Sequence, residues 1–251
     1  MLSGLSDLLH ANENCCFVTH RGGRHDYRTW SEDLYNLLRL FFHSDRLYPF
    51  AAETKVVAGA YDAEKHKGEI IFYGASNFAR WTDMEQDLAP FRVQNHGFGG
   101  SSDTDLMFYA EELLFPYEPK AVFFQTGSND YVQLEGTDEE KLRYCMEKKR
   151  NMFETFHQRL PKAKFVIMSG LLLPGREEYR GLTEEINFQL SLLCAEKDYM
   201  TFVDASDMTY SDEGFRTELF VDDLIHLNRE GQLLWAEDYI LPVLRAMESV
   251  K

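Results

Sequence analysis

The stretch EIIFYGASNFARW, residues 69–81, holds the strand-to-helix junction from which the interpretation of this chain starts. Its first five residues form a mostly apolar run rich in β-formers, the pattern of a strand that is covered on both faces. Gly74-Ala75-Ser76 ends this run, and the residues after it are typical of the start of a helix. A serine at such a junction either caps the helix or serves as a nucleophile.

The alternation of strand and helix continues to the C-terminus. Further short apolar runs lie at residues 91–95, 121–125, 164–169 and 200–204. Helical patterns lie near residues 80–88, 103–114, 138–159, 177–197 and 229–247. Asp103 is the expected N-cap of the second of these helices. Repeated βα units predict a five-stranded parallel sheet in a three-layer, doubly wound (flavodoxin-like) α/β fold.

Residues 1–68 precede this pattern, and we expect them to form a helical and irregular extension packed on the α/β domain of residues 69–251. Residues 28–50 contain a helical pattern capped by Ser31, with leucine and phenylalanine on one face. The segment before it, THRGGRHDYR, is locally basic. We favour a solvated turn and a packed helix, and the alternative is an arm that borders the active site or a subunit contact.

Composition limits the classes of partner. The chain has 251 residues, a hydrophobic content of 44% and a formal net charge of −16 at pH 7. Such an acidic surface argues against nucleic-acid binding, because phosphate recognition requires a basic surface. It also disfavours stable association with anionic membranes.

The N-terminal sequence and the cysteines indicate the compartment. The first residues lack both the basic leader and the apolar region of a signal peptide. No apolar run approaches the roughly 20 residues that span a bilayer. The four cysteines show no C-x-x-C spacing, so reduced thiols are favoured over disulfides or a zinc site. We therefore expect a cytoplasmic protein.

Polar and small residues follow the predicted strands at the edge of the sheet where open parallel sheets bind ligands. Ser76 follows the first strand, and the glycine-rich stretch at 95–105 follows the second. Asn129 follows the third strand, and Asp223 and His226 come after the fifth, just before the last helix. The predicted topology therefore gathers these residues on one rim.

The gathered residue types suit acyl transfer. Ser76 becomes a nucleophile when a base takes its proton, and His226 is a suitable base near neutral pH. Asp223 is placed to orient the imidazole and to stabilise the imidazolium. The backbone N–H groups of Ser76 and Gly100 and the side-chain amide of Asn129 are candidate donors to the developing oxyanion.

Each motif also has an ordinary structural interpretation. Ser76 alone is more often a cap or turn residue. GFGGSS alone could be a phosphate-binding loop, although it fits neither G-x-G-x-x-G followed by a ribose-binding acid nor a Walker lysine pattern. GSND is a good turn, DDLIH could contain a pair of metal ligands, and HLNREG could simply start a helix capped by Asn228. Their order and their common position at strand ends favour the catalytic interpretation.

Four ordered blocks of the chain resemble those of the SGNH hydrolases, also called GDSL-type esterases and lipases. The matching stretches are, in order, FYGASN, NHGFGGSS, GSND and DDLIHLN. The resemblance covers about residues 60–247 and is specific for the fold and the catalytic machinery. The chain departs from the family at Ala75, where the first block often has an aspartate that is not part of the triad.

The resemblance implies a serine hydrolase of carboxylic esters, with Ser76, His226 and Asp223 as its triad and Ser76, Gly100 and Asn129 as its oxyanion hole. Water would then hydrolyse the acyl-enzyme, and neither a metal nor an organic cofactor is implied. A short acyl group is the expected substrate, such as an acetyl group on a carbohydrate. The alternatives are a lysophospholipase or thioesterase of the same family, or a non-catalytic binding protein on the same scaffold.

We also expect Asn77, Leu171 and Leu172 to contact the small-molecule ester. Leu171 begins an apolar run on the active rim, and charged residues follow it closely at Arg176, Glu177, Glu178 and Arg180. These charges suit a hydrated entrance, and the leucines either face the site or pack against the neighbouring helix. The sequence leaves open the natural substrate and whether the chain forms a homo-oligomer.

Overall fold

The computed structural model describes residues 49–249. The chain divides into two compact units, Met1–Ala51 and Ala52–Lys251, and the sheet belongs to the second. Residues 52–68 are part of this second unit, whereas the sequence pattern set the start of the α/β domain at residue 69. Tyr61 connects residues 52–68 to the sheet, because its hydroxyl accepts a hydrogen bond from the backbone N–H of Asn95 in β2. The proposed helix at Ser31 lies outside the described residues.

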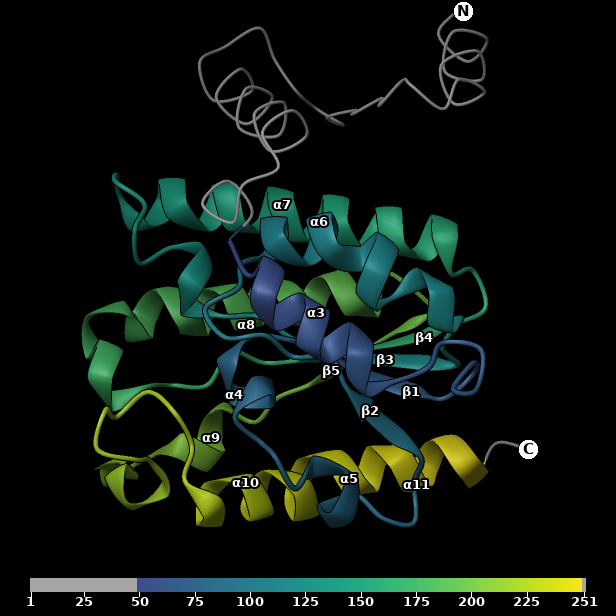
Figure 1. The fold of residues 1–251 in the computed structure, drawn as a ribbon. Coiled ribbons are helices and arrows are strands. Elements are labelled where there is room, and N and C mark those ends of the chain that lie inside the picture. The colour runs from purple at the N-terminus through teal and green to yellow at the C-terminus, as the bar shows by residue number, and fades with distance from the viewer. Residues whose placement is uncertain (1–48, 250–251) are drawn as a thin grey trace, which may run out of the picture. The chain divides into compact units, whose positions relative to one another are not determined.

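A five-stranded parallel sheet forms the centre of this unit, which confirms the predicted α/β fold (Figure 1). The strand order is β2-β1-β3-β4-β5, as in a doubly wound sheet. The strands are β1 (Ile70–Gly74), β2 (Val93–Asn95), β3 (Ala121–Gln125), β4 (Lys164–Met168) and β5 (Met200–Val203). The apolar runs therefore predicted every strand of this sheet to within about two residues at either end.

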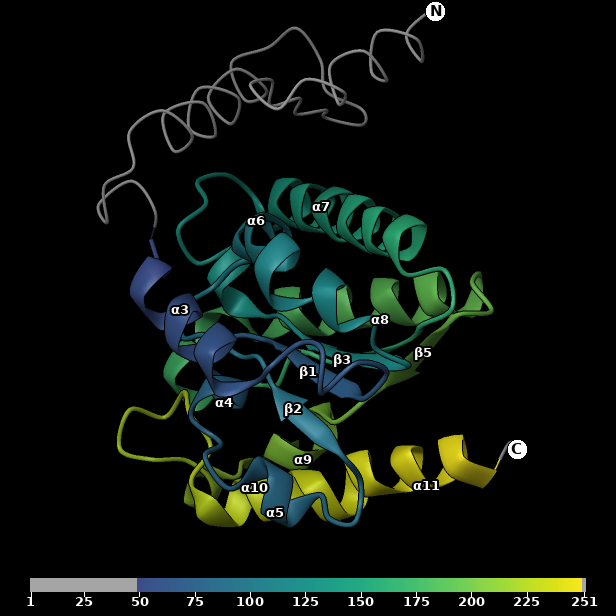
Figure 2. The same cartoon turned by 45° about the vertical axis from the view of Figure 1, so that its right-hand side comes forward.

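Helices cover both faces of the sheet (Figures 1 and 2). On one face lie α6 (Asp103–Leu113), α7 (Asp138–Arg159) and α8 (Arg180–Ala195). On the other lie α5 (Met84–Asp87), α10 (Arg229–Trp235) and α11 (Leu241–Ser249), with a π-helix at Ala236–Ile240 joining the last two. The remaining α-helices of the described residues are α3 (Ala51–Ala60), α4 (Ser76–Ala79) and α9 (Ser206–Thr209). Within residues 49–249, no helix is both long and apolar enough to cross a membrane.

Burial on both faces explains why the strands are continuously apolar. Successive residues of a strand point to opposite faces, and both Phe72 and Tyr73 of β1 are fully buried. On one face Phe72 stacks on Phe123 with ring centroids 4.6 Å apart, in a cluster that reaches Trp235 of α10. On the opposite face Tyr73 lies against the aromatic side chains of β3 and α7.

The cap of α6 differs from the prediction. Ser102, not Asp103, is the N-cap: its hydroxyl accepts a hydrogen bond from the N–H of Asp105, whose carboxylate accepts one from the N–H of Ser102. This reciprocal capping box leaves Asp103 as the first helical residue, with its side chain free to point into the protein. A short antiparallel hairpin, β6 (Tyr210–Ser211) with β7 (Gly214–Phe215), was also not expected.

Candidate active site

The hydroxyl of Ser76 does not cap a helix. Ser76 is the first residue of α4 and is separated from β1 by one residue, Ala75, which is the N-cap of the helix and makes no side-chain capping bond. The serine Oγ instead lies 2.8 Å from Nε2 of His226, a residue 150 positions further along the chain. This contact excludes the capping interpretation of Ser76.

His226 is held between Ser76 and Asp223. The imidazole Nδ1 lies 2.7 Å from Oδ2 of Asp223. The other carboxylate oxygen, Oδ1, accepts the backbone N–H groups of Ile225 and His226, both at 2.9 Å. Although desolvation acts in the opposite direction, these hydrogen bonds hold the pKa of Asp223 well below its ordinary value. Asp223 is therefore a carboxylate near neutral pH. It accepts a hydrogen bond from the N–H at Nδ1, and Nε2 then faces the serine.

Arg80 is a further neighbour of this carboxylate that the sequence analysis missed. Its Nη1 donates to Oδ2 of Asp223 at 3.2 Å, and the two side chains are 55% and 38% exposed. Arg80 lies four residues after Ser76, a spacing that brings residues to the same side of a helical turn and could have indicated its position. Solvent screens such an exposed pair, so its contribution to stability is small.

Asn129 ties two of the strand-end loops together. It lies in the 3₁₀ turn Ser128–Asp130, which follows β3, and its Nδ2 donates to the carbonyl oxygen of Ser101 at 3.1 Å. An amide nitrogen carries two N–H groups, so a second donor remains for a ligand. GSND therefore forms a turn, as its sequence suggested, and its asparagine also has an N–H group that can donate to a ligand.

The loop that contains Gly100 runs past the serine. Gly100 has a φ of +81°, a conformation that glycine adopts without strain. A Cβ on the preceding Gly99 would lie 3.9 Å from the Cβ of Ser76, which shows how closely this backbone approaches. Gly100 itself does not line the pocket described below. Its role as an oxyanion donor stays a prediction.

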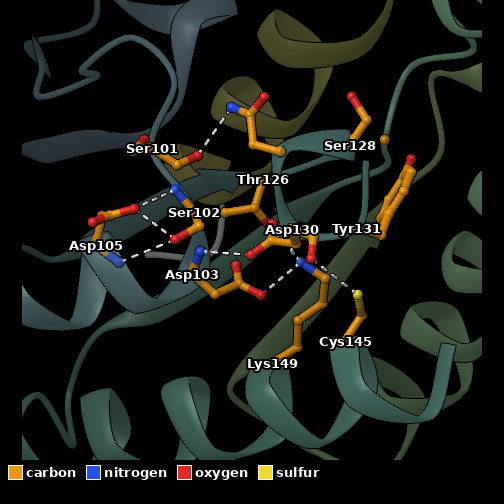
Figure 3. A network of polar contacts seen from close by, with 12 residues as sticks. Ser101, Ser102, Asp103, Asp105, Thr126, Ser128, Asp130, Tyr131, Cys145 and Lys149 are labelled. Carbon is orange, nitrogen blue, oxygen red and sulfur yellow. Dashed lines mark hydrogen bonds and ion pairs between the residues drawn. The ribbon is translucent and has the colours of Figure 1, made fainter. Parts of the chain in front are cut away.

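A buried group of charged side chains joins the start of α6 to the turn after β3 (Figure 3). Nζ of Lys149, on α7, donates to Oδ2 of Asp103 at 2.9 Å and to the hydroxyl of Thr126 at 2.6 Å, and it lies 3.8 Å from Oδ2 of Asp130. Asp130 Oδ1 accepts the backbone N–H of Asp103 at 2.8 Å. Asp103 begins the helix after the Gly100 loop and Asp130 adjoins Asn129, so this group links the segments that carry both candidate donors.

Two carboxyl groups share one ammonium in this group. Burial, and next the charge of Asp103, raise the pKa of Asp130 to about 7. Burial alone would lower the pKa of Lys149, but the charges of Asp103 and Asp130 raise it above its ordinary value. Lys149 is therefore charged near neutral pH, and the carboxyl group of Asp130 keeps its proton to a higher pH than an exposed aspartate does.

A pocket of about 30 Å³ opens beside the serine. Among the residues that line it are Ser76, Asn77, Asn129, Leu171, Leu173 and Arg176. Asn77 lies in the pocket as expected, but its Oδ1 also accepts the backbone N–H of Leu227 at 3.2 Å. It therefore fastens the helix of Ser76 to the segment that follows His226.

Leu172, expected to contact substrate, does not line this pocket, whereas Leu171 and Leu173 do. Leu173 has an extended backbone, with φ −106° and ψ 121°. Alternate side chains of an extended segment point in opposite directions, so Leu172 faces away. Its backbone N–H donates to the hydroxyl of Thr209 at 3.2 Å, and its side chain is buried.

The structure is therefore that of an α/β protein with a row of contacts at the carboxyl edge of its sheet, in which the serine contacts the histidine and the histidine contacts the aspartate. Residues 57–234 match the model of the GDSL-like Lipase/Acylhydrolase family, and the chain belongs to that family. Family membership implies a hydrolase of ester bonds. No curated protein shows significant similarity to the chain.

Solved structures show the same fold at low sequence identity. A GDSL-like lipase from Bacteroides thetaiotaomicron is 16% identical, with a TM-score of 0.61, over 80% of this chain and 98% of that one. An acetyl-xylooligosaccharide esterase from Geobacillus is 17% identical, with a TM-score of 0.51, over 68% and 91%. The catalytic domain of a peptidoglycan O-acetyltransferase from Streptococcus pneumoniae is 14% identical, with a TM-score of 0.51, over 73% and 94%.

Proposed function

We propose that this protein is a serine esterase that hydrolyses short-chain carboxylic esters. Ser76 Oγ attacks the acyl carbon while His226 Nε2 takes its proton, and Asp223 stabilises the imidazolium that forms. The imidazolium then gives the proton to the leaving alcohol, and an acyl-enzyme remains. Water, deprotonated by the same imidazole, attacks the acyl-enzyme and releases the acid and free Ser76.

Three donors stabilise the negative oxygen of each tetrahedral intermediate in this proposal. They are the backbone N–H groups of Ser76 and Gly100 and the free N–H of the Asn129 amide. Fixed donors of this kind stabilise charge that develops only in the transition state, so they raise kcat. The bond from Asn129 to Ser101 O fixes the plane of the amide before the substrate binds.

The observation that carries the proposal is the chain of contacts from Ser76 Oγ through His226 to Asp223, at 2.8 and 2.7 Å. A non-catalytic binding protein has no need to keep this proton path assembled. The structural neighbours include an acetyl-xylooligosaccharide esterase and a peptidoglycan O-acetyltransferase. Both names refer to acetyl groups, which supports an acetyl or similarly small acyl group in the substrate of this protein. The small pocket, about 30 Å³, supports the same substrate class.

Ser76→Ala tests the proposal. We expect hydrolysis of p-nitrophenyl acetate to fall by about 10⁴-fold or more, with an unchanged circular-dichroism spectrum. Labelling by a fluorophosphonate probe should disappear in the same variant. Ser191→Ala is the matched control, because Ser191 is a half-buried serine on α8 that does not line the pocket and whose hydroxyl donates to the carbonyl of Phe188. Near-normal turnover by purified Ser76→Ala would contradict the proposed mechanism.

A further inference from the structure

Arg176 brings a positive charge into the pocket of Ser76. It lies in the 3₁₀ segment Pro174–Tyr179, between β4 and α8, and it lines the pocket together with Ser76 and Asn129. Its Nη1 donates to the hydroxyl of Ser128 and, at 3.3 Å, to Oδ1 of Asn129. The guanidinium is therefore anchored to the turn that also presents the Asn129 amide.

This guanidinium has no carboxylate partner among residues 49–249. Other arginines near it are paired: Arg80 with Asp223, and Arg180 with Glu184 at 2.8 Å. An arginine has five N–H groups, and both protein contacts of Arg176 use Nη1. The edge formed by Nε and Nη2 has no acceptor from the described protein, so it remains available to a ligand.

The backbone beside Arg176 is fixed to the turn that carries the histidine. The N–H of Gly175 donates to the carbonyl of Leu224 at 2.9 Å. A Cβ at position 175 would lie only 2.8 Å from the carbonyl oxygen of Asp223, so a larger residue would push the two segments apart. Arg176 is thus held at a defined place relative to Asp223, which a specific binding contact requires.

We propose that Arg176 recognises a carboxylate on the ester that this site cleaves. The two parallel N–H groups of the free guanidinium edge match the two oxygens of a carboxylate. The chain carries a net charge of −16, which repels an anionic substrate. The positive charge of Arg176, which has no carboxylate partner among residues 49–249, offsets this repulsion inside the pocket and favours binding of the anion.

This inference rests on the proposed function, and paired substrates test it. The first pair places the charge on the alcohol side: 4-acetoxybenzoate and its neutral counterpart 4-acetoxybenzamide. The second places it on the acyl side: the p-nitrophenyl monoester of succinic acid and the corresponding succinamic ester. For each pair, the ratio of kcat/KM between the anionic and the neutral ester is measured in the wild type and in variants, which cancels intrinsic differences in reactivity.

In Arg176→Gln we expect this ratio to fall by about tenfold or more in at least one pair, equivalent to about 1.4 kcal/mol. Arg176→Lys should restore part of it, because the charge returns without the fork. Added salt should lower the ratio in the wild type, since the guanidinium is only half-buried. Arg150→Gln is the matched control and should leave the ratio unchanged, because Arg150 lies on α7, pairs with Glu196 and does not line the pocket.

An equal loss on the anionic and neutral esters in both pairs would overturn the inference, because Arg176 would then act only through Asn129. Calorimetric titration with 4-hydroxybenzoate and 4-hydroxybenzamide gives a readout without turnover. Tighter binding of the carboxylate that is lost in Arg176→Gln supports the inference even if no ester is cleaved, a result that would contradict only the proposed function. Turnover without any such selectivity supports the proposed function and contradicts the inference.

Discussion

At the scale of single residues, three neighbours in the turn after β3 have three different tasks. The Ser128 hydroxyl accepts from Arg176, the Asn129 amide donates to Ser101, and the Asp130 carboxyl turns inward to the buried charges. A 3₁₀ turn makes this divergence natural, because successive side chains leave it about 120° apart. One short motif therefore serves the pocket, the loop of Gly100 and the interior.

The first prediction concerns the amide of Asn129. In Asn129→Ala we expect kcat for p-nitrophenyl acetate to fall by about 10²-fold or more, the usual effect of removing one oxyanion donor. The melting temperature should change only modestly, since one hydrogen bond to Ser101 is lost. Steady-state kinetics and a thermal melt measure both quantities.

Asn151→Ala is the control for this substitution, because Asn151 on α7 is half-buried and, within residues 49–249, the hydrogen bond of its amide goes to the sulfur of Met107. It should leave kcat unchanged. An unchanged kcat in Asn129→Ala together with a collapsed melting temperature would show that Asn129 serves only the turn.

At the scale of elements, Lys149 of α7 joins three segments of the chain at one buried point. Its ammonium meets Asp103 at the start of α6, Thr126 after β3, and Asp130 in the following turn. The side chains of Lys149 and Asp103 are 3% and 1% exposed. Oδ1 of Asp103 and Oδ2 of Asp130 have no hydrogen-bond partner in the described protein, so a proton on Asp130 relieves the excess of negative charge.

The second prediction follows from the raised pKa of Asp130. An unfolded aspartate has a pKa of about 3.9, whereas burial and Asp103 raise the pKa of Asp130 to about 7 in the folded protein. Between these values the folded state binds more protons, so this group lowers the free energy of unfolding as pH rises from about 4 to 7. Asp130→Asn removes the titration and keeps the shape of the side chain.

We therefore expect the unfolding free energy of Asp130→Asn, relative to the wild type, to increase as pH rises from 5 to 7 and to level off above. The slope can reach at most about 1.4 kcal/mol per pH unit. Urea titrations at each pH measure it, and Asp212→Asn at an exposed turn should show no such trend. A pH-independent difference would mean that Asp130 has the same protonation in both states.

At the scale of the whole molecule, the sheet gathers the site from distant parts of the sequence. The loops after β1, β2, β3 and β4 and the segment before α10 meet at the carboxyl edge of the sheet. This edge offers a small pocket whose lining includes the polar residues Ser76, Asn77 and Asn129, and the chain as a whole is strongly acidic. Both features bear on which esters reach Ser76.

The third prediction is that short acyl chains are preferred. Acetate and butyrate esters of p-nitrophenol should have higher kcat/KM than the dodecanoate. A pocket of about 30 Å³ has little apolar surface with which to gain the ~0.8 kcal/mol per methylene that burial would provide. The comparison is made below the concentrations at which the esters aggregate.

Ser191→Ala, which lies outside the site, should show the same chain-length profile as the wild type. A rate that climbs steadily with chain length, or rises sharply when an oil interface forms, would contradict the short-acyl proposal. That result would favour the lysophospholipase alternative.

The sequence by itself determined the parallel sheet, the order of its strand-end motifs and membership in the family. These features rest on local patterns: Ile70–Gly74 is continuously apolar because both faces of the strand are buried, and each motif follows its strand directly. The order of the motifs also predicted that Ser76, Asp223 and His226 gather on one rim, but only the tertiary structure decided the individual contacts. Ser76 and His226 are 150 residues apart, and Arg80, Arg176 and Lys149 found their partners across different strands and loops. Periodicity in sequence reports which face a residue occupies, but strand order and loop direction set its neighbours, and those depend on the packing of the whole sheet.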